Sequence, residues 1–124
     1  MTLLLDTHVL LWWMFDDDRL TSAMREAISD PATSVAVSAV SAWELAIKAA
    51  LGKLAIPDDL TEEIQRQGFA AIPVTVEDGV AAGALPRHHA NPFDRMLIAQ
   101  ALRRGLVLVT ADRRFADYDV PTLA

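Results

Sequence analysis

The sequence predicts an α/β fold with a central parallel sheet flanked by helices on both faces, in a single domain of residues 1–124. Short apolar runs alternate along the chain with longer stretches of helical spacing, as in strands joined by helical crossovers. The run Leu106-Val107-Leu108-Val109 is entirely aliphatic, which is typical of a strand buried on both faces of a parallel sheet. With 52% apolar residues, a chain of 124 residues can bury one core.

The first predicted elements extend to residue 38. Leu3-Leu4-Leu5 favours a short strand, and a helix follows over residues 8–15. An acidic turn separates this helix from a second one at 21–29, which Asp30-Pro31 ends. Residues 34–38 alternate apolar and small side chains and predict the second strand.

The middle of the chain predicts three helices and one strand. A helix over 42–51 and another over about 58–67 each end at a glycine. Residues 70–72 indicate a third strand, which a proline cuts short. The segment Thr-Val-Glu-Asp at 75–78 resembles a capping box and opens a short helix to about residue 84.

The last third predicts a loop, a helix and two strands. Residues 86–91 have loop character, and the helix 92–104 begins with proline and is followed by glycine. The strand 106–109 comes next, and then a helical turn after Asp112 and a last strand at 120–123.

Composition narrows the class of protein. The chain has no cysteine, which excludes a thiolate nucleophile, a disulfide scaffold and a cysteine-based zinc site. The apolar start reaches Asp6 before it is long enough for a membrane span or a signal peptide. We therefore expect a cytoplasmic protein with no membrane association.

Charge is distributed unevenly along the chain. The formal net charge is -6, yet residues 85–124 carry six basic and four acidic side chains. The six basic residues of this segment are all arginines: Arg87, Arg95, Arg103, Arg104, Arg113 and Arg114. They fit either a local phosphate-binding face or a solvated helix surface, and charge alone leaves both open.

Four carboxylates lie just after a predicted strand or near the start of a predicted helix. Asp6 follows the first strand, Glu44 lies early in the helix after the second strand, and Asp112 follows the strand 106–109. These three map to the carboxyl edge of the sheet, where open α/β sheets bind ligands. Asp94 opens the helix 92–104 and reaches that edge only if its helix begins there.

Each acid also has a purely structural explanation. Asp6 and Asp112 fit helix caps, Ser41-Ala42-Trp43-Glu44 fits a capping box, and Asp94 fits the third position of a helix capped by Asn91. Gathered at one edge, however, the four carboxylates repel one another and require a cation. Oxygen ligands of this kind suit Mg²⁺ or Mn²⁺, which can activate a water for attack on phosphorus.

The histidines and the aromatic stretch 12–15 are expected to have structural rather than catalytic roles. His88 and His89 lie in the predicted loop and are expected to be solvated, with phosphate contact as the alternative. His8 is expected to be packed or partly exposed rather than catalytic. The stretch 12–15, Trp-Trp-Met-Phe, is too bulky for one helix face to bury, so we expect part of it in a protein interface or the whole helix in the core.

Four ordered motifs resemble those of a PIN domain, in particular the VapC-type toxins of bacterial type II toxin–antitoxin systems. They span nearly the whole chain and read Leu3-Leu4-Leu5-Asp6-Thr7-His8, Ser41-Ala42-Trp43-Glu44-Leu45, Pro92-Phe93-Asp94-Arg95 and Leu108-Val109-Thr110-Ala111-Asp112. The resemblance implies that all four acids share one pocket, in a Mg²⁺- or Mn²⁺-dependent endoribonuclease.

The resemblance also implies roles for individual residues. It implies Asp6 and Asp94 as principal metal ligands, Asp112 as a further ligand, and Glu44 as a ligand or general base. Thr110 and Thr7 are expected to orient the carboxylates, and we expect the arginines beside two of the acids, Arg95 and Arg113, to contact RNA. The implied partners are an RNA substrate, a VapB-type antitoxin and a second copy of the chain.

Three alternatives remain at this stage. A receiver-like signalling module fits the length and the first Asp, but the chain lacks an Asp after the third strand and a Lys after the last. A haloacid-dehalogenase-like phosphatase requires a second acid where His8 stands. The third alternative is an inactive PIN scaffold that only binds a partner, and the intact acids argue against it.

Overall fold

A computed structural model describes all 124 residues and contains one five-stranded sheet with the strand order β3-β2-β1-β4-β5. All neighbouring strands pair in parallel, as the sequence predicts. The strands are β1 (Thr2–Leu5), β2 (Ser34–Ser38), β3 (Ala70–Ile72), β4 (Val107–Val109) and β5 (Thr122–Leu123).

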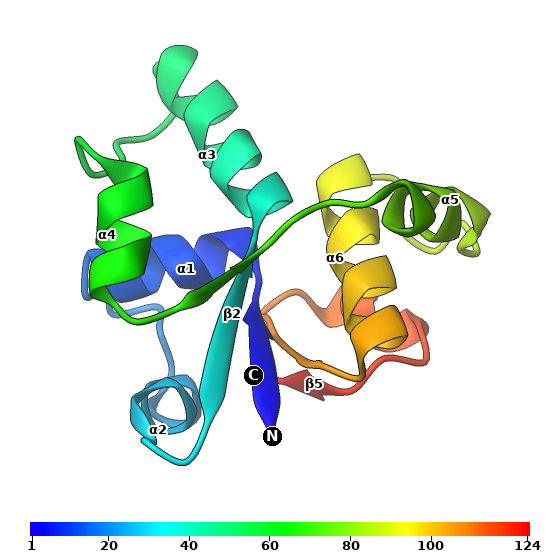
Figure 1. Cartoon of the computed structure of the whole chain (residues 1–124), viewed down its shortest axis with the longest axis horizontal. Helices are drawn as coiled ribbons and strands as arrows, with labels where there is room; N and C mark the ends of the chain where they lie inside the picture. The colour runs from blue at the N-terminus through cyan, green and yellow to red at the C-terminus, as the bar shows by residue number, and fades with distance from the viewer.

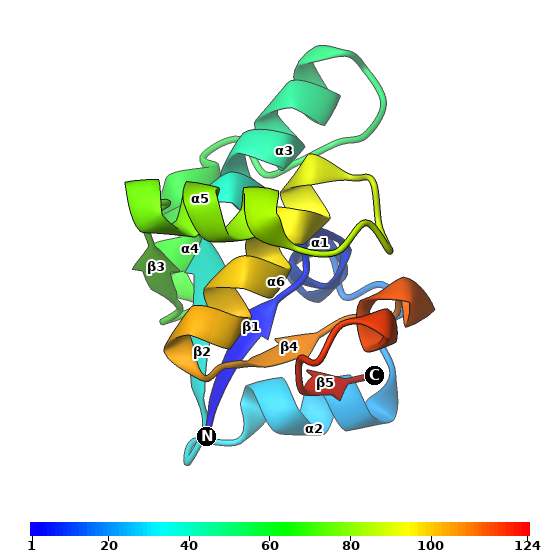
Figure 2. The ribbon, with the colours of Figure 1, turned by 90° about the vertical axis from the view of Figure 1, so that its right-hand side faces the viewer.

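Helices cover both faces of this sheet. They are α1 (Thr7–Met14), α2 (Ser22–Ser29), α3 (Ala39–Ala50), α4 (Leu60–Arg66), α5 (Val76–Ala84), α6 (Pro92–Arg104) and a short 3-10 helix, η1 (Arg113–Asp117). Figure 1 shows α1, α2 and α4 on one side of the strands and α5 and α6 on the other, with α3 extending beyond the sheet. Figure 2 shows α5 and α6 lying over the second face. No helix has both the length and the apolar character needed to cross a membrane.

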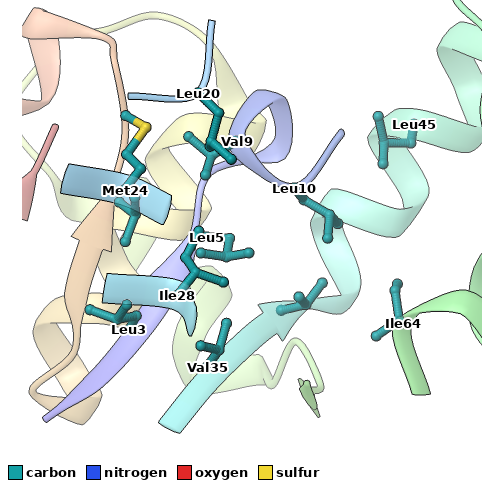
Figure 3. Packing of buried hydrophobic residues seen from close by; sticks show 12 residues of the cluster. Leu3, Leu5, Val9, Leu10, Leu20, Met24, Ile28, Val35, Leu45 and Ile64 are labelled. Carbon is teal, nitrogen blue, oxygen red and sulfur yellow. The ribbon is translucent and has the colours of Figure 1, made fainter. Parts of the chain in front are cut away.

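The strand β1 explains why both faces need a cover. Leu3 and Leu5 are fully buried in one apolar cluster with α1, α2, α3 and α4, whereas Leu4 is buried in a second cluster with α6 and η1. Successive side chains of a strand point to opposite faces, so three consecutive leucines serve two cores. Figure 3 shows the first cluster, in which Met24 and Ile28 of α2 face the side chains of β1 and β2.

The helix α3 begins three residues earlier than the sequence predicts. Ser38 is its N-cap and accepts a hydrogen bond from the Val40 N–H, so the predicted capping box beginning at Ser41 is wrong. Ser41 is instead buried inside the helix, where its Oγ accepts a hydrogen bond from Thr7 Oγ1 at 3.1 Å. This tertiary contact between α1 and α3 is not encoded in local sequence.

The stretch 12–15 is neither fully buried in the core nor fully exposed for an interface, the two outcomes that the sequence left open. Trp12, Trp13 and Met14 are partly buried and pack against the first cluster, whereas Phe15 is exposed. Trp13 Nε1 donates to Gln67 Oε1 at 2.9 Å, and the Arg19 guanidinium lies 5.2 Å from the Trp12 ring. The stretch is therefore mainly core, and it carries one exposed aromatic side chain.

The strand order creates a crevice between β1 and β4. After β1 the chain moves outward through β2 and β3, and it then returns to pair β4 with the other side of β1. Helices that leave the carboxyl ends of β1 and β4 therefore diverge to opposite sides of the sheet. Ligands of open α/β sheets bind at such a point.

Candidate metal centre

A cavity of about 380 Å³ lies at this crevice. Its lining includes three of the four predicted acids, Asp6, Asp94 and Asp112, together with Arg114. Asp6 caps the start of α1, Asp112 caps the start of η1, and Asp94 lies in the first turn of α6. The capping roles and the shared cavity are therefore compatible, because each cap stands at the carboxyl edge of the sheet.

Asp6 is buried and held by two hydrogen bonds. Its Oδ1 accepts from the His8 N–H at 3.0 Å, and its Oδ2 accepts from Thr110 Oγ1 at 2.5 Å. Burial raises the pKa of Asp6, although both hydrogen bonds favour the charged carboxylate. Thr110 thus orients this acid, whereas Thr7 departs from the expectation because its hydroxyl donates to Ser41 rather than to a carboxylate.

Glu44 is 2% exposed and does not line the cavity, but its charge raises the pKa of both Asp6 and Asp94. Lys48, one turn later on α3, donates to Glu44 Oε2 at 2.7 Å. The other oxygen, Oε1, is buried and has no hydrogen-bond partner. A buried carboxylate oxygen without a donor is costly, so Glu44 has one oxygen available to a ligand.

Asp94 has a strongly raised pKa. Burial, together with the negative charges of Asp6, Glu44 and Asp112, raises the pKa of Asp94 to about 7. These interactions show that the fold brings all four predicted acids into electrostatic contact. Without a cation, Asp94 is therefore partly protonated near neutral pH.

Asp112 behaves in the opposite way because an arginine holds it. Arg114 donates to both oxygens of Asp112, at 2.8 Å to Oδ2 and 3.1 Å to Oδ1, and lowers the pKa of Asp112 to about 2. Arg114 also lines the acidic cavity, whereas Arg113 lines a neighbouring cavity of about 330 Å³. Arg114 was not singled out from the sequence, whereas the predicted contact of Arg113 with substrate stays a prediction.

His89 contradicts the expectation of a solvated loop. It is buried, and its Nε2 lies 3.0 Å from Asp94 Oδ2 and 3.4 Å from Asp112 Oδ2. The loop folds inward because the Tyr118 hydroxyl accepts from the His89 N–H at 3.0 Å and the imidazole packs against the Phe115 ring. Both contacts join segments more than 25 residues apart, so no local sequence signal identifies them. His88 is exposed, as expected.

The sequence pattern of the PIN domain family matches residues 3–121, nearly the whole chain. The chain belongs to the PIN domain family. Ribonuclease VapC22 of Mycobacterium tuberculosis is 35% identical to this chain in an alignment of 128 positions, gaps included. The alignment covers 97% of this chain and 94% of that protein. Membership of the family decides against the receiver-like and haloacid-dehalogenase-like alternatives.

Solved structures share the fold of this PIN domain. A toxin–antitoxin complex from Klebsiella pneumoniae superposes with a TM-score of 0.69 at 18% identity, over 98% of this chain and 95% of that chain. VapBC2 from Rickettsia felis, bound to a DNA fragment from its promoter, superposes with a TM-score of 0.67 at 13% identity, over 99% and 98% of the two chains. These likenesses establish the architecture of the sheet and its helices.

Arg95 has a structural role in this PIN domain. Its guanidinium donates to the carbonyl oxygens of Ala82, Leu85 and Pro86 at 2.8–2.9 Å, and so holds the end of α5 against α6. It also lines a cavity of about 370 Å³ together with Arg87 and His89. Its predicted contact with substrate stays a prediction.

The donor set of the acidic cavity fits a hard divalent cation. Asp94 and Asp112 offer oxygen atoms that lie within 4.8 Å of each other and of His89 Nε2. Asp6 lines the same cavity, and Glu44, whose charge acts on Asp94, has one buried oxygen without a hydrogen-bond partner. Carboxylate oxygens with room for water are what Mg²⁺ and Mn²⁺ prefer. The raised pKa of Asp94 reflects burial first, and then the negative charge of the neighbouring acids.

The raised pKa of Asp94 predicts a pH dependence of stability in the metal-free protein. Between the unfolded pKa near 3.8 and the folded pKa of about 7, the folded state holds a proton that the unfolded state has lost. The free energy of unfolding therefore falls as the pH rises through this window, with a slope of at most about 1.4 kcal/mol per pH unit, the value for one proton. We expect Asp94→Asn to remove most of this fall in urea titrations with EDTA between pH 5 and pH 8. Parallel curves for the variant and the original protein would contradict the assignment.

Proposed function

We propose that this protein is a divalent-metal-dependent endoribonuclease and the toxin of a type II toxin–antitoxin pair. The observation that carries the proposal is a group of four carboxylates at the β1–β4 crevice: three line one cavity, and the charges of Asp6, Glu44 and Asp112 all raise the pKa of Asp94. Mutual repulsion among these acids destabilises the folded protein, and a bound cation would neutralise the repulsion and use the acids as ligands. The similarity to ribonuclease VapC22 supports RNA as the substrate.

In this proposal Asp6 and Asp94 hold the cation, which is Mg²⁺ or Mn²⁺. Asp6 presents its carboxylate rigidly because Thr110 and the His8 N–H fix both oxygens. Asp94 gives up its proton when the cation binds, since the added positive charge lowers its pKa. Asp112 completes the site or supports a second ion. When bound, the cation would polarise the phosphodiester and lower the pKa of a water.

The residues around the cation position the water and the substrate. Glu44 is a ligand or a general base, and its Oε1 is the buried oxygen free for either role, whereas Lys48 holds Oε2. Attack of the water on phosphorus breaks the bond to the 3′ oxygen, which leaves a 5′-phosphate and a 3′-hydroxyl. Arg114 and Arg19, at the edge of the cavity, offset the negative charge that the RNA backbone brings.

The toxin role rests on the relatives. The solved structures with this fold include toxin–antitoxin complexes from several bacteria, such as Salmonella typhimurium and Klebsiella pneumoniae. We propose that a VapB-type antitoxin covers this chain, with Phe15 and the neighbouring residues of α1 as part of its docking surface. A cytoplasmic location, in keeping with the absence of cysteine, would bring the enzyme to its RNA.

Cleavage of a mixed cellular RNA pool tests the proposed activity. We expect discrete fragments with 5′-phosphates in Mg²⁺ or Mn²⁺, none in EDTA, and a loss of at least about 100-fold in Asp94→Asn because the cation loses a ligand. Sequencing of the fragment ends would identify the cleavage site.

The matched control for this assay is Asp58→Asn, which removes one exposed charge that does not line the cavity. It should cleave at the original rate. If Asp94→Asn and the original protein give the same fragments, the activity does not come from this site. If neither cleaves RNA, the partner-binding scaffold becomes the better account.

RNA affinity tests the predicted arginine contacts. We propose that Arg95 and Arg113 bind phosphates flanking the cleaved bond, since both line cavities beside the acids. Each change to Gln should weaken binding and reduce the slope of log affinity against log salt by about 1, as expected for one lost phosphate contact. Arg66→Gln on α4 is the control. An unchanged slope in the double variant would contradict the contacts.

A homodimer is proposed from the exposed apolar residues of α5. Val76 and Val80 lie one turn apart and are 81% and 70% exposed, so a second copy is a suitable cover. We expect light scattering to give twice the chain mass of 13.5 kDa, and the change of both valines to Glu to halve it. Leu102→Glu, at an exposed apolar position on α6, should leave the dimer intact. A monomer throughout the micromolar range would contradict the proposal.

A further inference from the structure

We propose that His89 is a positioning residue that donates its Nε2–H to the Asp94 and Asp112 carboxylates and fixes their spacing for the cation. The inference rests on the proposed function, because it concerns the same acidic cavity. The roles given above to the four acids, the threonines and the arginines do not include it.

The imidazole of His89 is locked in place on several sides. Its side chain is 1% exposed, and its ring lies against the Phe115 ring with a centroid distance of 5.7 Å. Its backbone N–H donates to Tyr118 Oη at 3.0 Å, and its carbonyl oxygen accepts from Arg95 at 3.3 Å. A ring held this firmly cannot swing out to solvent without unfolding its loop.

The hydrogen bond at Nδ1 determines which nitrogen of the ring carries the proton. The Asn91 N–H donates to His89 Nδ1 at 3.2 Å, so Nδ1 must present its lone pair. The ring proton is therefore on Nε2. The same Asn91 caps α6 with its side chain, accepting from the N–H groups of Phe93 and Asp94. One short segment thus sets the position of the imidazole and of Asp94 together.

The Nε2 atom is directed at the acids and has no other partner. It lies 3.0 Å from Asp94 Oδ2 and 3.4 Å from Asp112 Oδ2, and neither oxygen is in line with the N–H, so the proposed donation is shared between the two carboxylates. A buried N–H between two carboxylate oxygens reduces their mutual repulsion and attracts both. It engages one oxygen of each acid and leaves the other oxygen of Asp94 for the cation.

This geometry argues that His89 is not itself a metal ligand, even though its Nε2 lies among candidate donor atoms. Ligation by Nε2 would move the proton to Nδ1 and bring two N–H groups face to face at Asn91. The cost of two opposed donors in a buried site is that of a lost hydrogen bond plus an unsatisfied group. The cation is therefore expected to bind oxygen ligands only.

Two substitutions distinguish the role of Nε2 from the role of Nδ1. His89→Gln keeps an amide N–H near the position of Nε2 but loses the acceptor for Asn91. His89→Asn keeps an acceptor near the position of Nδ1 but loses the donor to the acids. Thermal unfolding in EDTA would establish that each variant folds.

Mn²⁺ affinity, measured by calorimetry without RNA, is the main readout. We expect about 10–100-fold weaker binding for His89→Asn and less than a few-fold change for His89→Gln, because only the donor to the carboxylates matters. His88→Asn, a change of the exposed neighbouring histidine, should have no effect. If His89→Gln loses affinity while His89→Asn keeps it, His89 only braces the loop and the inference is overturned.

Two spectroscopic measurements test the inference without any measurement of activity. In metal-free protein, the ¹⁵N chemical shifts of the His89 ring should be those of an unprotonated Nδ1 and a protonated Nε2; the reverse tautomer would overturn the inference. With Mn²⁺ bound, electron spin-echo spectra should show no directly coordinated nitrogen, and a coupling lost in His89→Asn would make His89 a ligand instead. A protein that binds Mn²⁺ as described but cleaves no RNA would disprove the proposed function and leave this inference standing.

Discussion

Repulsion among four carboxylates at one edge of the sheet is the constraint on which the site depends. Parallel strands deliver Asp6, Glu44 and Asp112 to the same edge, and the start of α6 adds Asp94. Burial makes each negative charge more costly than it would be in water. The result is visible at Asp94, whose pKa rises to about 7 because of burial and the three neighbouring acids.

The protein neutralises these acids unequally, and the inequality determines where a cation is needed. Asp112 is paired with Arg114, Glu44 with Lys48, and Asp6 accepts hydrogen bonds from Thr110 and the backbone. No arginine or lysine pairs with Asp94. The one basic side chain within 4.0 Å of its carboxylate is His89, whose Nε2 also lies near Asp112. A divalent cation beside Asp94 would therefore remove the largest remaining electrostatic cost.

Much of the fold was predictable because it depends on local patterns. The aliphatic run that contains β4, the proline and glycine that bound α6, and the capping box of α5 all appear in the structure where they were expected. The start of α3 was misplaced because Ser41, which resembles a cap, is used in a contact with Thr7. The acids at strand ends were also predictable, since parallel strands share a carboxyl edge.

The supporting residues of the site were not predictable in this way. His89 is placed by Tyr118 and Phe115, and Arg114 rather than Arg113 faces the cavity because of the rotation of one short helix. Lys48 pairs with Glu44 at helical spacing, which is a local signal, but its importance follows only from the burial of Glu44. Contacts between distant segments and the burial of individual side chains require the three-dimensional structure.

Diffraction from crystals soaked in Mn²⁺, with anomalous scattering used to locate the ion, tests the central claim most directly. The account predicts a peak in the acidic cavity that is bonded to carboxylate oxygens of Asp6 and Asp94 and absent from crystals of Asp94→Asn. An empty cavity at millimolar Mn²⁺, or a peak bonded elsewhere while the four acids stay unchanged, would contradict the account of this site as a metal centre.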